Sequence, residues 1–573
     1  MNTTPEPQAE GHTRIGVRWT APGPGSWICD RSHALPGPTP LHRRIMGEHT
    51  APTYREVFEN FGVTLDTIDM RFVNGAVYRR LVPLIGAERD NGKVPPYAVL
   101  WLATRLHPTM RRRNRIALRV MADRSFLSDI EHWLETERFE WIEANQEFQA
   151  VEVGALGDKE LADHLRALDQ FLIRGWRRHH QLHGNDLGPI GDLLAHGQSW
   201  GLDSIEVMGL LKGASPATTA AAAHGHLMAE ALERGGVDPT SVTSVDMIRS
   251  VPDAATALDD YLDLFGWRLI SDYDIEGLTL NELPSAVCAI VRRAAHGNTS
   301  GENGGTGGSA GDAEMAETEA KLRAQADDPE LFDELLDSAR RAYGVRDDNG
   351  PLTWAWPAGL TRRAYLEAAD RLAAQAQIED PDHVFELDID ELAAALEGAT
   401  SPSAVQVTER ALYREWESSL RAPDVLGPVA ADPDLSPLPT GSRRLMGIIM
   451  AAVSMLEPDP EVSTASLSGL GIGAEPYRGT ARVADDPATA IAEMQPGDVL
   501  IAPWTAPSFN AVFAIAGGVV VQEGGLLCHA AVMARELGIP AVIGCRDVMN
   551  QINSGDEVEV DPVAGQVAIL SRA

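Results

Sequence analysis

The sequence predicts a multidomain protein in which a mostly α-helical part precedes a compact C-terminal α/β domain. Long segments before residue 422 carry apolar side chains at the spacing of amphipathic helices, and residues 161–182 and 216–234 are two of them. From about residue 469 onward, short β-branched runs alternate with helical segments, which is typical of an α/β domain. A Gly- and Ser-rich stretch at 296–312 interrupts the helical part.

The length, net charge and cysteine content of the chain exclude several classes of function. The 573 residues are enough for about three to four domains, and their 83 acidic and 48 basic side chains give a net charge of −35, which disfavours binding to nucleic acid or anionic membranes. No apolar run is long enough to span a membrane, and the first residues lack a signal peptide pattern. The four cysteines have no metal or disulfide spacing, so we expect a cytoplasmic protein with reduced thiols.

These shifts in composition divide the chain into six expected segments. They are a disordered N-terminus (1–20), the first part of a helical domain (21–295), a flexible linker or loop (296–312), the second part of the helical domain (313–421), a proline-rich hinge region (422–468) and the α/β domain (469–573).

One stretch of the α/β domain predicts a strand, a tight turn and a helix in succession. The β-branched run 517–522 ends before two glycines at 524–525, which permit a tight turn. Residues 528–537 then favour a helix, and Gly538 is a typical C-terminal stop. His529 is therefore expected at a helix N-terminus, directly after a glycine turn.

A histidine in that position has two chemical properties. The unpaired N–H groups and partial positive charge of a helix N-terminus keep an imidazole neutral and nucleophilic, and they stabilise a phosphoryl group carried on the ring. A phosphohistidine needs both. The alternative is that His529 only caps a helix beside the core.

Residues 524–544 (GGLLCHAAVMARELGIPAVIG) resemble the phosphohistidine signature of the phosphoenolpyruvate (PEP)-utilising enzymes, which include PEP synthases and rifampin phosphotransferases. In that family the histidine of the motif carries phosphate between two distant sites on a swivelling domain. The resemblance continues at 496–503, 505–507 and 555–561. It implies that 469–573 form a swivelling phosphohistidine domain with His529 as the carrier.

The same motifs supply further candidate residues by resemblance. Cys528 and Arg535 accompany His529 as catalytic candidates, with Arg535 balancing the charge of a transferring group, and Thr505 is a candidate for substrate binding. Upstream, 27–33 (WICDRSH) followed by 36–40 (PGPTP) resembles the opening of the substrate domain of rifampin phosphotransferases. There Asp30 becomes a substrate-binding candidate and His33 a catalytic candidate, unless His33 simply lies on the surface.

A third block, residues 265–284, resembles another part of that substrate domain, and it makes Arg268 and Glu282 substrate-binding candidates. If buried, these two could equally form a structural ion pair. His179, His180 and His183 are spaced so that a helix would gather them on one face. We saw no carboxylate or cysteine at ligand spacing, so a zinc site is disfavoured, and either a pocket lining or a surface position is expected.

The resemblance also indicates what the chain lacks. The ATP-grasp domain of the family precedes the substrate domain, whose opening already begins at Trp27, and the PEP-binding barrel of the synthases would follow residue 573. We therefore expect this chain to bind no cofactor itself. ATP and Mg²⁺ would be held by a separate ATP-grasp subunit that phosphorylates His529 in trans, and the swivelling domain would deliver the phosphoryl group to a hydroxylated small molecule.

Two other hypotheses remain open. In one, His529 stays docked on the substrate pocket and acts as a general acid/base, for example in a lyase or dehydratase acting on a hydroxylated, polyketide-like substrate without ATP. In the other, the protein is a binding or regulatory remnant, which leaves the His529 motif unexplained. The near-complete motif favours phosphoryl transfer, in which His33 or an acidic neighbour would deprotonate the acceptor hydroxyl.

Overall fold

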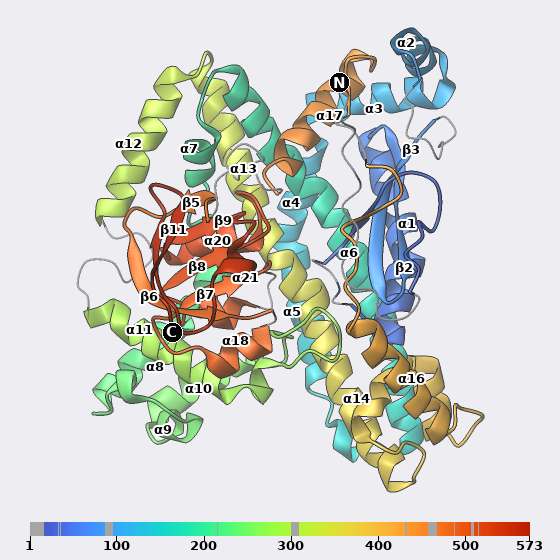
Figure 1. Ribbon diagram of the computed structural model, residues 1–573, viewed down its shortest axis with the longest axis vertical. Helices are drawn as coiled ribbons and strands as arrows, with labels where there is room; N and C mark the ends of the chain where they lie inside the picture. Colours follow the sequence, from blue (N-terminus) through green and yellow to red (C-terminus); the bar gives the residue numbers. More distant parts are fainter. Residues whose placement is uncertain are drawn as a thin grey trace.

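A helical part and a C-terminal sheet domain lie against each other (Figure 1), as the sequence predicts. The computed structural model describes residues 17–31, 34, 36–85, 95–214, 216–299, 309–429, 433–456, 467–485, 487–505, 509–513 and 515–573. His33, most of the expected disordered N-terminus and the middle of the expected linker lie outside these residues.

The long helix α6 (Asp158–Ser199) is the axis of the helical part. It packs antiparallel to α13 (Pro329–Gly350), which continues through the π-helical turn η5 (Pro351–Ala355) into α14 (Trp356–Ala374). The contacts between the two run in opposite order along the chain. Gly175 lies against the Thr353 carbonyl, and the Asn349 side-chain amide donates to the His179 carbonyl oxygen at 2.9 Å.

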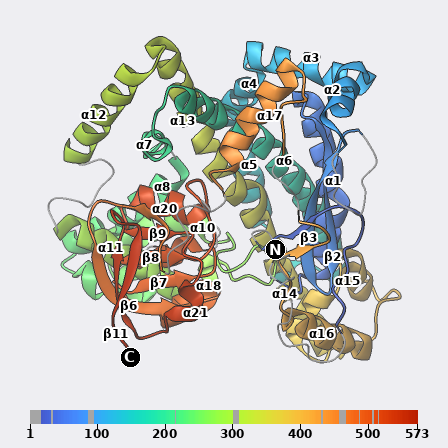
Figure 2. The ribbon, with the colours of Figure 1, turned by 45° about the horizontal axis from the view of Figure 1, so that its top comes forward.

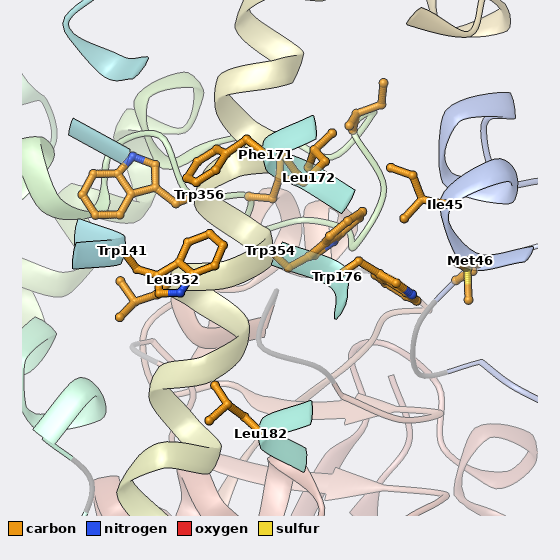
Figure 3. Close-up of a cluster of buried hydrophobic side chains, with 14 of the residues drawn as sticks. Ile45, Met46, Trp141, Phe171, Leu172, Trp176, Leu182, Leu352, Trp354 and Trp356 are labelled. Carbon is orange, nitrogen blue, oxygen red and sulfur yellow. The ribbon is translucent and has the colours of Figure 1, made fainter. Parts of the chain in front are cut away.

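Aromatic side chains fill the space beside this helix pair (Figure 3). Trp176 from α6 and Trp354 from η5 meet edge to face, with ring centroids 4.9 Å apart, and both are buried. Each indole N–H still has an acceptor: Trp176 donates to the Thr50 hydroxyl at 3.0 Å and Trp354 to the Tyr273 carbonyl at 2.7 Å. Because both polar atoms are satisfied, the core accommodates two indoles without an unpaired donor.

A small antiparallel sheet covers one side of the helical part (Figure 2), where the sequence predicted mostly helices and no particular strand. Its described strands are ordered β2 (Leu65–Val73), β3 (Ala76–Pro83), β1 (Trp27–Cys29) and β4 (Val425–Leu426). Asn74 and Gly75 connect β2 to β3 with φ values of 47° and 79°, which suits a two-residue hairpin turn.

The C-terminal domain is the expected α/β domain. Its described strands are ordered β11 (Gln566–Ser571), β10 (Glu557–Asp561), β6 (Tyr477–Val483), β7 (Val499–Ala502), β8 (Gly518–Val521), β9 (Ala541–Ile543) and β5 (Leu470–Ile472). Strands β6 to β9 are mutually parallel, and the outer pairs are antiparallel. The central strands β7 and β8 are fully buried, because apolar side chains cover both faces of the sheet.

The expected hinge region, 422–468, is only partly a connection. Val425 and Leu426 pair with β1. Helix α17 (Thr440–Val453) packs along α6, where Ile448 lies against Gly191. The Leu445 and Met446 side chains of α17 join a separate buried cluster with Val63 and Ala117. The proline-rich composition predicted irregular backbone, but it did not reveal that short apolar pieces within it complete the helical part. The connection between the helical part and the C-terminal domain therefore begins after α17, and not at residue 422.

The remaining helices surround these elements. In chain order they are α1 (Pro40–Phe61), α2 (Tyr97–Leu106), α3 (Pro108–Asp123), α4 (Ser125–His132), η1 (Trp133–Glu137), α5 (Arg138–Gln149), η2 (Val153–Ala155), α7 (Ser204–Gly209), α8 (Pro216–Arg234), η3 (Pro239–Ser241), α9 (Val245–Arg249), α10 (Pro252–Phe265), η4 (Leu280–Glu282), α11 (Pro284–Thr299), α12 (Ser309–Gln325), η6 (Pro381–Glu386), α15 (Ile389–Leu396), α16 (Ala404–Ser418), α18 (Pro487–Glu493), α19 (Asn510–Phe513), α20 (His529–Leu537) and α21 (Val548–Gln551). Among the described residues, no helix combines the length and the apolar character needed to cross a membrane.

The close approach of α6 to η5 is testable at Gly175. A Cβ atom added there would lie 1.9 Å from the Thr353 carbonyl oxygen, so we expect Gly175→Ala to destabilise the helical part by about 1–3 kcal/mol and to lower its thermal unfolding midpoint. Gly447→Ala on α17 is the matched control, because a Cβ there has no heavy atom within 4 Å and alanine favours the helix. Equal midpoints for the two variants would contradict the packing.

Candidate active site

His529 is the first residue of α20, and the glycine turn before it is required by the backbone. Gly524 has a φ of 128°, and a Cβ there would lie 2.6 Å from the Cys528 sulfur, so only glycine fits. Cys528 takes the N-cap position, and Gly538, in the left-handed conformation, ends the helix. The strand, turn and helix expected around His529 are thus confirmed.

The surroundings of the His529 ring keep it neutral. Its Nδ1 atom lies 3.2 Å from the Thr505 hydroxyl, and its ring meets Phe513 edge-on at 5.5 Å between centroids. Burial lowers the imidazole pKa from 6.5 to about 3. Burial likewise raises the pKa of the Cys528 thiol to about 11, so this thiol is protonated at neutral pH and is a poor nucleophile.

The face of α20 that carries His529 is the face that docks on the helical part. His529, Val532 and Glu536 are spaced i, i+3 and i+7, so they share one side of the helix. Val532 is buried within the core of the helical part, and the Glu536 carboxylate accepts a hydrogen bond from the Gly213 N–H at 3.0 Å. The imidazole therefore begins a helix face that is buried against the helical part.

The turn before His529 is also anchored to the helical part. The Leu527 and Gly525 N–H groups donate to the carbonyl oxygens of Met455 and Leu456, which follow α17, at 2.6 and 3.1 Å. Leu527 belongs to the same buried cluster as α6 and α13. These bonds hold the glycine turn in one position while the domain is docked.

Two charged side chains, Arg535 and Glu523, connect the turn before His529 to the helical part. The Arg535 guanidinium reaches back along α20 to the Leu526 carbonyl at 3.3 Å and to the Tyr343 hydroxyl of α13 at 3.4 Å. On the other side, the Glu523 carboxylate lies 3.5 Å from the Arg31 guanidinium, next in sequence to Asp30. The His529 turn is therefore flanked by α13 and by the segment after β1.

A buried polar cluster lies in the helical part where α6 packs on α13, about one helical turn from Tyr343. His183 Nδ1 is 3.0 Å from an Asp186 carboxylate oxygen, and Arg346, one turn beyond Tyr343 on α13, is 3.5 Å from the same carboxylate. His179 packs edge-on against His183 with centroids 4.4 Å apart, and its Nε2 atom is 3.4 Å from the Tyr273 hydroxyl.

Electrostatic coupling extends this cluster towards β1. Burial raises the pKa of the Tyr54 phenol to about 12; the charges of Asp30 and Asp186 raise it further, and Arg79 and Arg346 oppose the rise. Burial also raises the pKa of Tyr273, again with Asp30 as the next cause. Asp30 is only 4% exposed, so its carboxylate faces the protein interior.

The structure therefore gathers most, though not all, of the residues that the sequence singled out. His529, Thr505, Cys528 and Arg535 lie at the turn or beside it. Asp30 is next in sequence to Arg31, which contacts Glu523 before the turn, and its own carboxylate lies 4.0 Å from Arg79. Whether each acts on a substrate stays a prediction. Among the described residues, no three His, Cys, Asp or Glu side chains come together as metal ligands.

Arg268 and Glu282 lie elsewhere, and they do not pair with each other. Arg268 is stacked between the rings of Phe265 and Trp356, and burial lowers its pKa to about 10. Glu282 bonds to Thr279 and to Arg362 of α14. Arg362 lies roughly 28 Å beyond Tyr343 along the continuous helix, so this geometry gives Glu282 no place beside His529.

Sequence reasoning missed the partners that organise the cluster. Asp186 follows His183 by three residues, a helical spacing that could have indicated the pair, although the sequence analysis found no carboxylate at ligand spacing. Arg346 and Tyr273 are distant in sequence from α6, and no local pattern joins them to it.

The charge state of His529 gives a testable pH dependence. Because its folded-state pKa lies below 6.5, the folded protein loses stability as the pH falls from about 6.5 towards 3, where the unfolded chain binds the proton more readily. Histidine NMR should show His529 neutral at pH 5, and His529→Asn should make the acid decline of the unfolding midpoint shallower.

His196 on α6 is the matched control for that titration. Its hydrogen bond to Asp192 raises its pKa, which is the opposite direction, so His196 should be protonated at a higher pH than an ordinary histidine. If His529 titrates with or above His196, the desolvated site described here is wrong.

Two segments of the chain match known protein families. Residues 494–565 match the PEP-utilising enzyme mobile domain, and residues 218–347 match the rifampicin phosphotransferase fourth domain. The first match contains His529 and its turn. The second contains α8 to α12 and most of α13, including Tyr343 and Arg346.

The chain is also similar to curated proteins. A rifampicin phosphotransferase of Streptomyces sp is 27% identical over 345 residues, which cover 57% of this chain and 36% of that protein. A prodigiosin synthesizing transferase, PigC of Serratia marcescens, is 29% identical over 233 residues (40% and 24%). A phosphoenolpyruvate synthase of Pseudomonas aeruginosa (strain UCBPP-PA14) is 36% identical over 110 residues (19% and 14%).

The similarity thus spans about a third of the length of the first of these relatives, and less of the other two. The two family matches lie in the C-terminal domain and in the helical part, respectively. The chain therefore carries a mobile domain of the PEP-utilising enzymes, docked on a helical part that resembles the rifampicin phosphotransferases.

Proposed function

We propose that this protein transfers a phosphoryl group to a hydroxyl of a small molecule bound by the helical part, with His529 as the phosphate carrier. A separate ATP-grasp subunit, which holds ATP and Mg²⁺, phosphorylates His529 in trans. The similarity to a rifampicin phosphotransferase supports the reaction class. The identity of the acceptor molecule is left open by this proposal.

The observation that carries the proposal is the docking of His529. His529 lies at a helix N-terminus, and the turn before it is bonded to the helical part at Met455 and Leu456. On the same helix, Arg535 contacts Tyr343 of α13, one turn from the Arg346 that pairs with Asp186. A carrier that takes phosphate from one site and delivers it to another needs such a removable contact.

The geometry suggests which ring nitrogen carries the phosphate. If the Thr505 hydroxyl accepts a hydrogen bond from Nδ1–H, the lone pair is left on Nε2. Nε2 then attacks the donor phosphorus as the bond from phosphorus to its leaving oxygen breaks, and the N–P bond forms. The α20 N-terminus stabilises the added negative charge, and the Arg535 guanidinium beside the turn contributes to this.

The carrier role is tested by intact-mass spectrometry at neutral to alkaline pH, where phosphohistidine survives. The chain isolated from its native host should carry one phosphate adduct, and His529→Ala should carry none. His383→Ala, which changes a histidine in η6 outside the site, is the control and should keep the adduct. An adduct that persists in His529→Ala would disprove the carrier role of this residue.

Thr505 gives a second, finer test. Thr505→Val removes the hydroxyl but keeps the shape, so Nδ1 loses its partner and the population of the reactive tautomer falls. We expect phosphorylation of His529 to slow by roughly tenfold, equivalent to about 1.4 kcal/mol, whereas Thr505→Ser should remain close to the native rate. The rate of adduct formation is the measurement, and equal rates for valine and serine would count against a role for the hydroxyl.

One observation favours the second hypothesis, an ATP-independent lyase. The pKa of about 3 describes a neutral His529 while it is docked, and a docked neutral imidazole can accept a proton from a substrate directly. An unmodified His529, together with loss of water from a hydroxylated compound without nucleotide, would replace phosphoryl transfer with this reaction.

A further inference from the structure

We infer that His183, oriented by Asp186 and Arg346, is the base that takes the proton from the acceptor hydroxyl. This rests on the proposed phosphoryl transfer through His529, and it assigns a role to a residue of the helical part that no similarity to known proteins supplied. His183 would be the catalytic residue, whereas Asp186 and Arg346 would be positioning residues.

The His183 tautomer follows from its partner. The buried Asp186 carboxylate pairs with the Arg346 guanidinium at 3.5 Å, so it acts as an acceptor and His183 Nδ1 donates to it across 3.0 Å. The lone pair is then on Nε2, for which the described residues supply no hydrogen-bond partner. The His183 side chain is 22% exposed, so this nitrogen can be reached from outside the core.

The position of the pair matches the docked carrier. Arg346 is one turn along α13 from Tyr343, whose hydroxyl shares the Arg535 guanidinium with the Leu526 carbonyl of the His529 turn. On the opposite side, the turn reaches Arg31, next to Asp30, whose charge acts on Tyr54 and Tyr273. Through Asp186 and Arg346, the His183 pair therefore lies about one helical turn from the contact between α13 and α20.

The proposed step balances as follows. The acceptor oxygen attacks the phosphorus of phospho-His529, the O–P bond forms, and the N–P bond breaks with its electron pair returning to the His529 ring. The hydroxyl proton passes to His183 Nε2, and the resulting imidazolium is stabilised by the Asp186 carboxylate. The proton leaves to solvent when the product departs, so no further reactant is needed.

Other titratable groups contact His183 or its partners, and they belong in any pH profile. They are His179 and Asp186 on α6, Arg346 on α13, Tyr273 beside His179, and Tyr54 on α1, which the charges of Asp186 and Arg346 affect. Burial keeps both tyrosines protonated at neutral pH.

The test uses the full chain phosphorylated chemically with phosphoramidate, which transfers its phosphoryl group to a histidine nitrogen with loss of ammonia. The transfer of labelled phosphate from phospho-His529 to water and to methanol is then followed at pH 8. Native protein should transfer about 100-fold faster than His183→Gln, because the variant keeps the helix but lacks the base. Both proteins should become phosphorylated on His529 to the same extent.

His196→Gln is the matched control for this experiment. His196 lies on the same helix and is also paired with an aspartate, Asp192 at 3.2 Å, but it is thirteen residues further along, or roughly 20 Å from His183. This variant should transfer at the native rate. A comparable loss in His196→Gln would point to damage to α6 rather than to missing base catalysis.

Asp186→Asn tests the positioning role with a readout that packing alone would not change. Nitrogen-15 NMR of labelled histidines should show His183 as the Nδ1–H tautomer in native protein, and the asparagine should allow the other tautomer, with slower transfer. An unchanged tautomer together with an unchanged rate would remove Asp186 from the proposal.

The possible results separate the two levels of inference. Equal transfer rates in native protein and His183→Gln, with His529 phosphorylated in both, would overturn the role of His183 and leave the carrier proposal intact. If phosphoramidate produced no adduct on His529 in the native chain, the carrier proposal and the role of His183 would both be overturned.

Discussion

The antiparallel packing of α6 on α13 is the constraint on which the rest of the molecule depends. Because Gly175 lets the α6 backbone approach the Thr353 carbonyl, the two helices are close enough for Asn349 to bond to the His179 carbonyl and for Arg346 to reach Asp186. Larger side chains at the crossing would separate these polar groups. The backbone contact at Gly175 thus determines how closely the charged side chains of Arg346 and Asp186 approach each other further along the same helix pair.

The C-terminal domain adds the His529 imidazole to the polar groups of the helical part. The helical part supplies histidines, carboxylates and an arginine that are held by each other, and the C-terminal domain supplies one neutral imidazole at a helix end. Neither part contains all the groups that the proposed transfer to a hydroxyl requires. The His529 ring is itself buried beside Thr505 and Phe513, and this burial accounts for its lowered pKa.

The sequence predicted some features well because their signals are local. The strand, glycine turn and helix around His529 follow from Gly524, Gly538 and the β-branched run before them, and each acts within a few residues. The hairpin at Asn74–Gly75 carried an equally local signal that the analysis overlooked. By contrast, the pairing of Asp186 with Arg346 joins residues 160 positions apart, and no local pattern encodes it.

The anchor of the glycine turn has a consequence for where a donor could stand. The turn is bonded to Met455 and Leu456, which are the last described residues of the helical part before the C-terminal domain. The contact that holds the turn and the point where the chain leaves the helical part therefore coincide. In the proposed reaction, a C-terminal domain that left the helical part would stay covalently attached at this point, so the donor subunit would have to approach the end of α17.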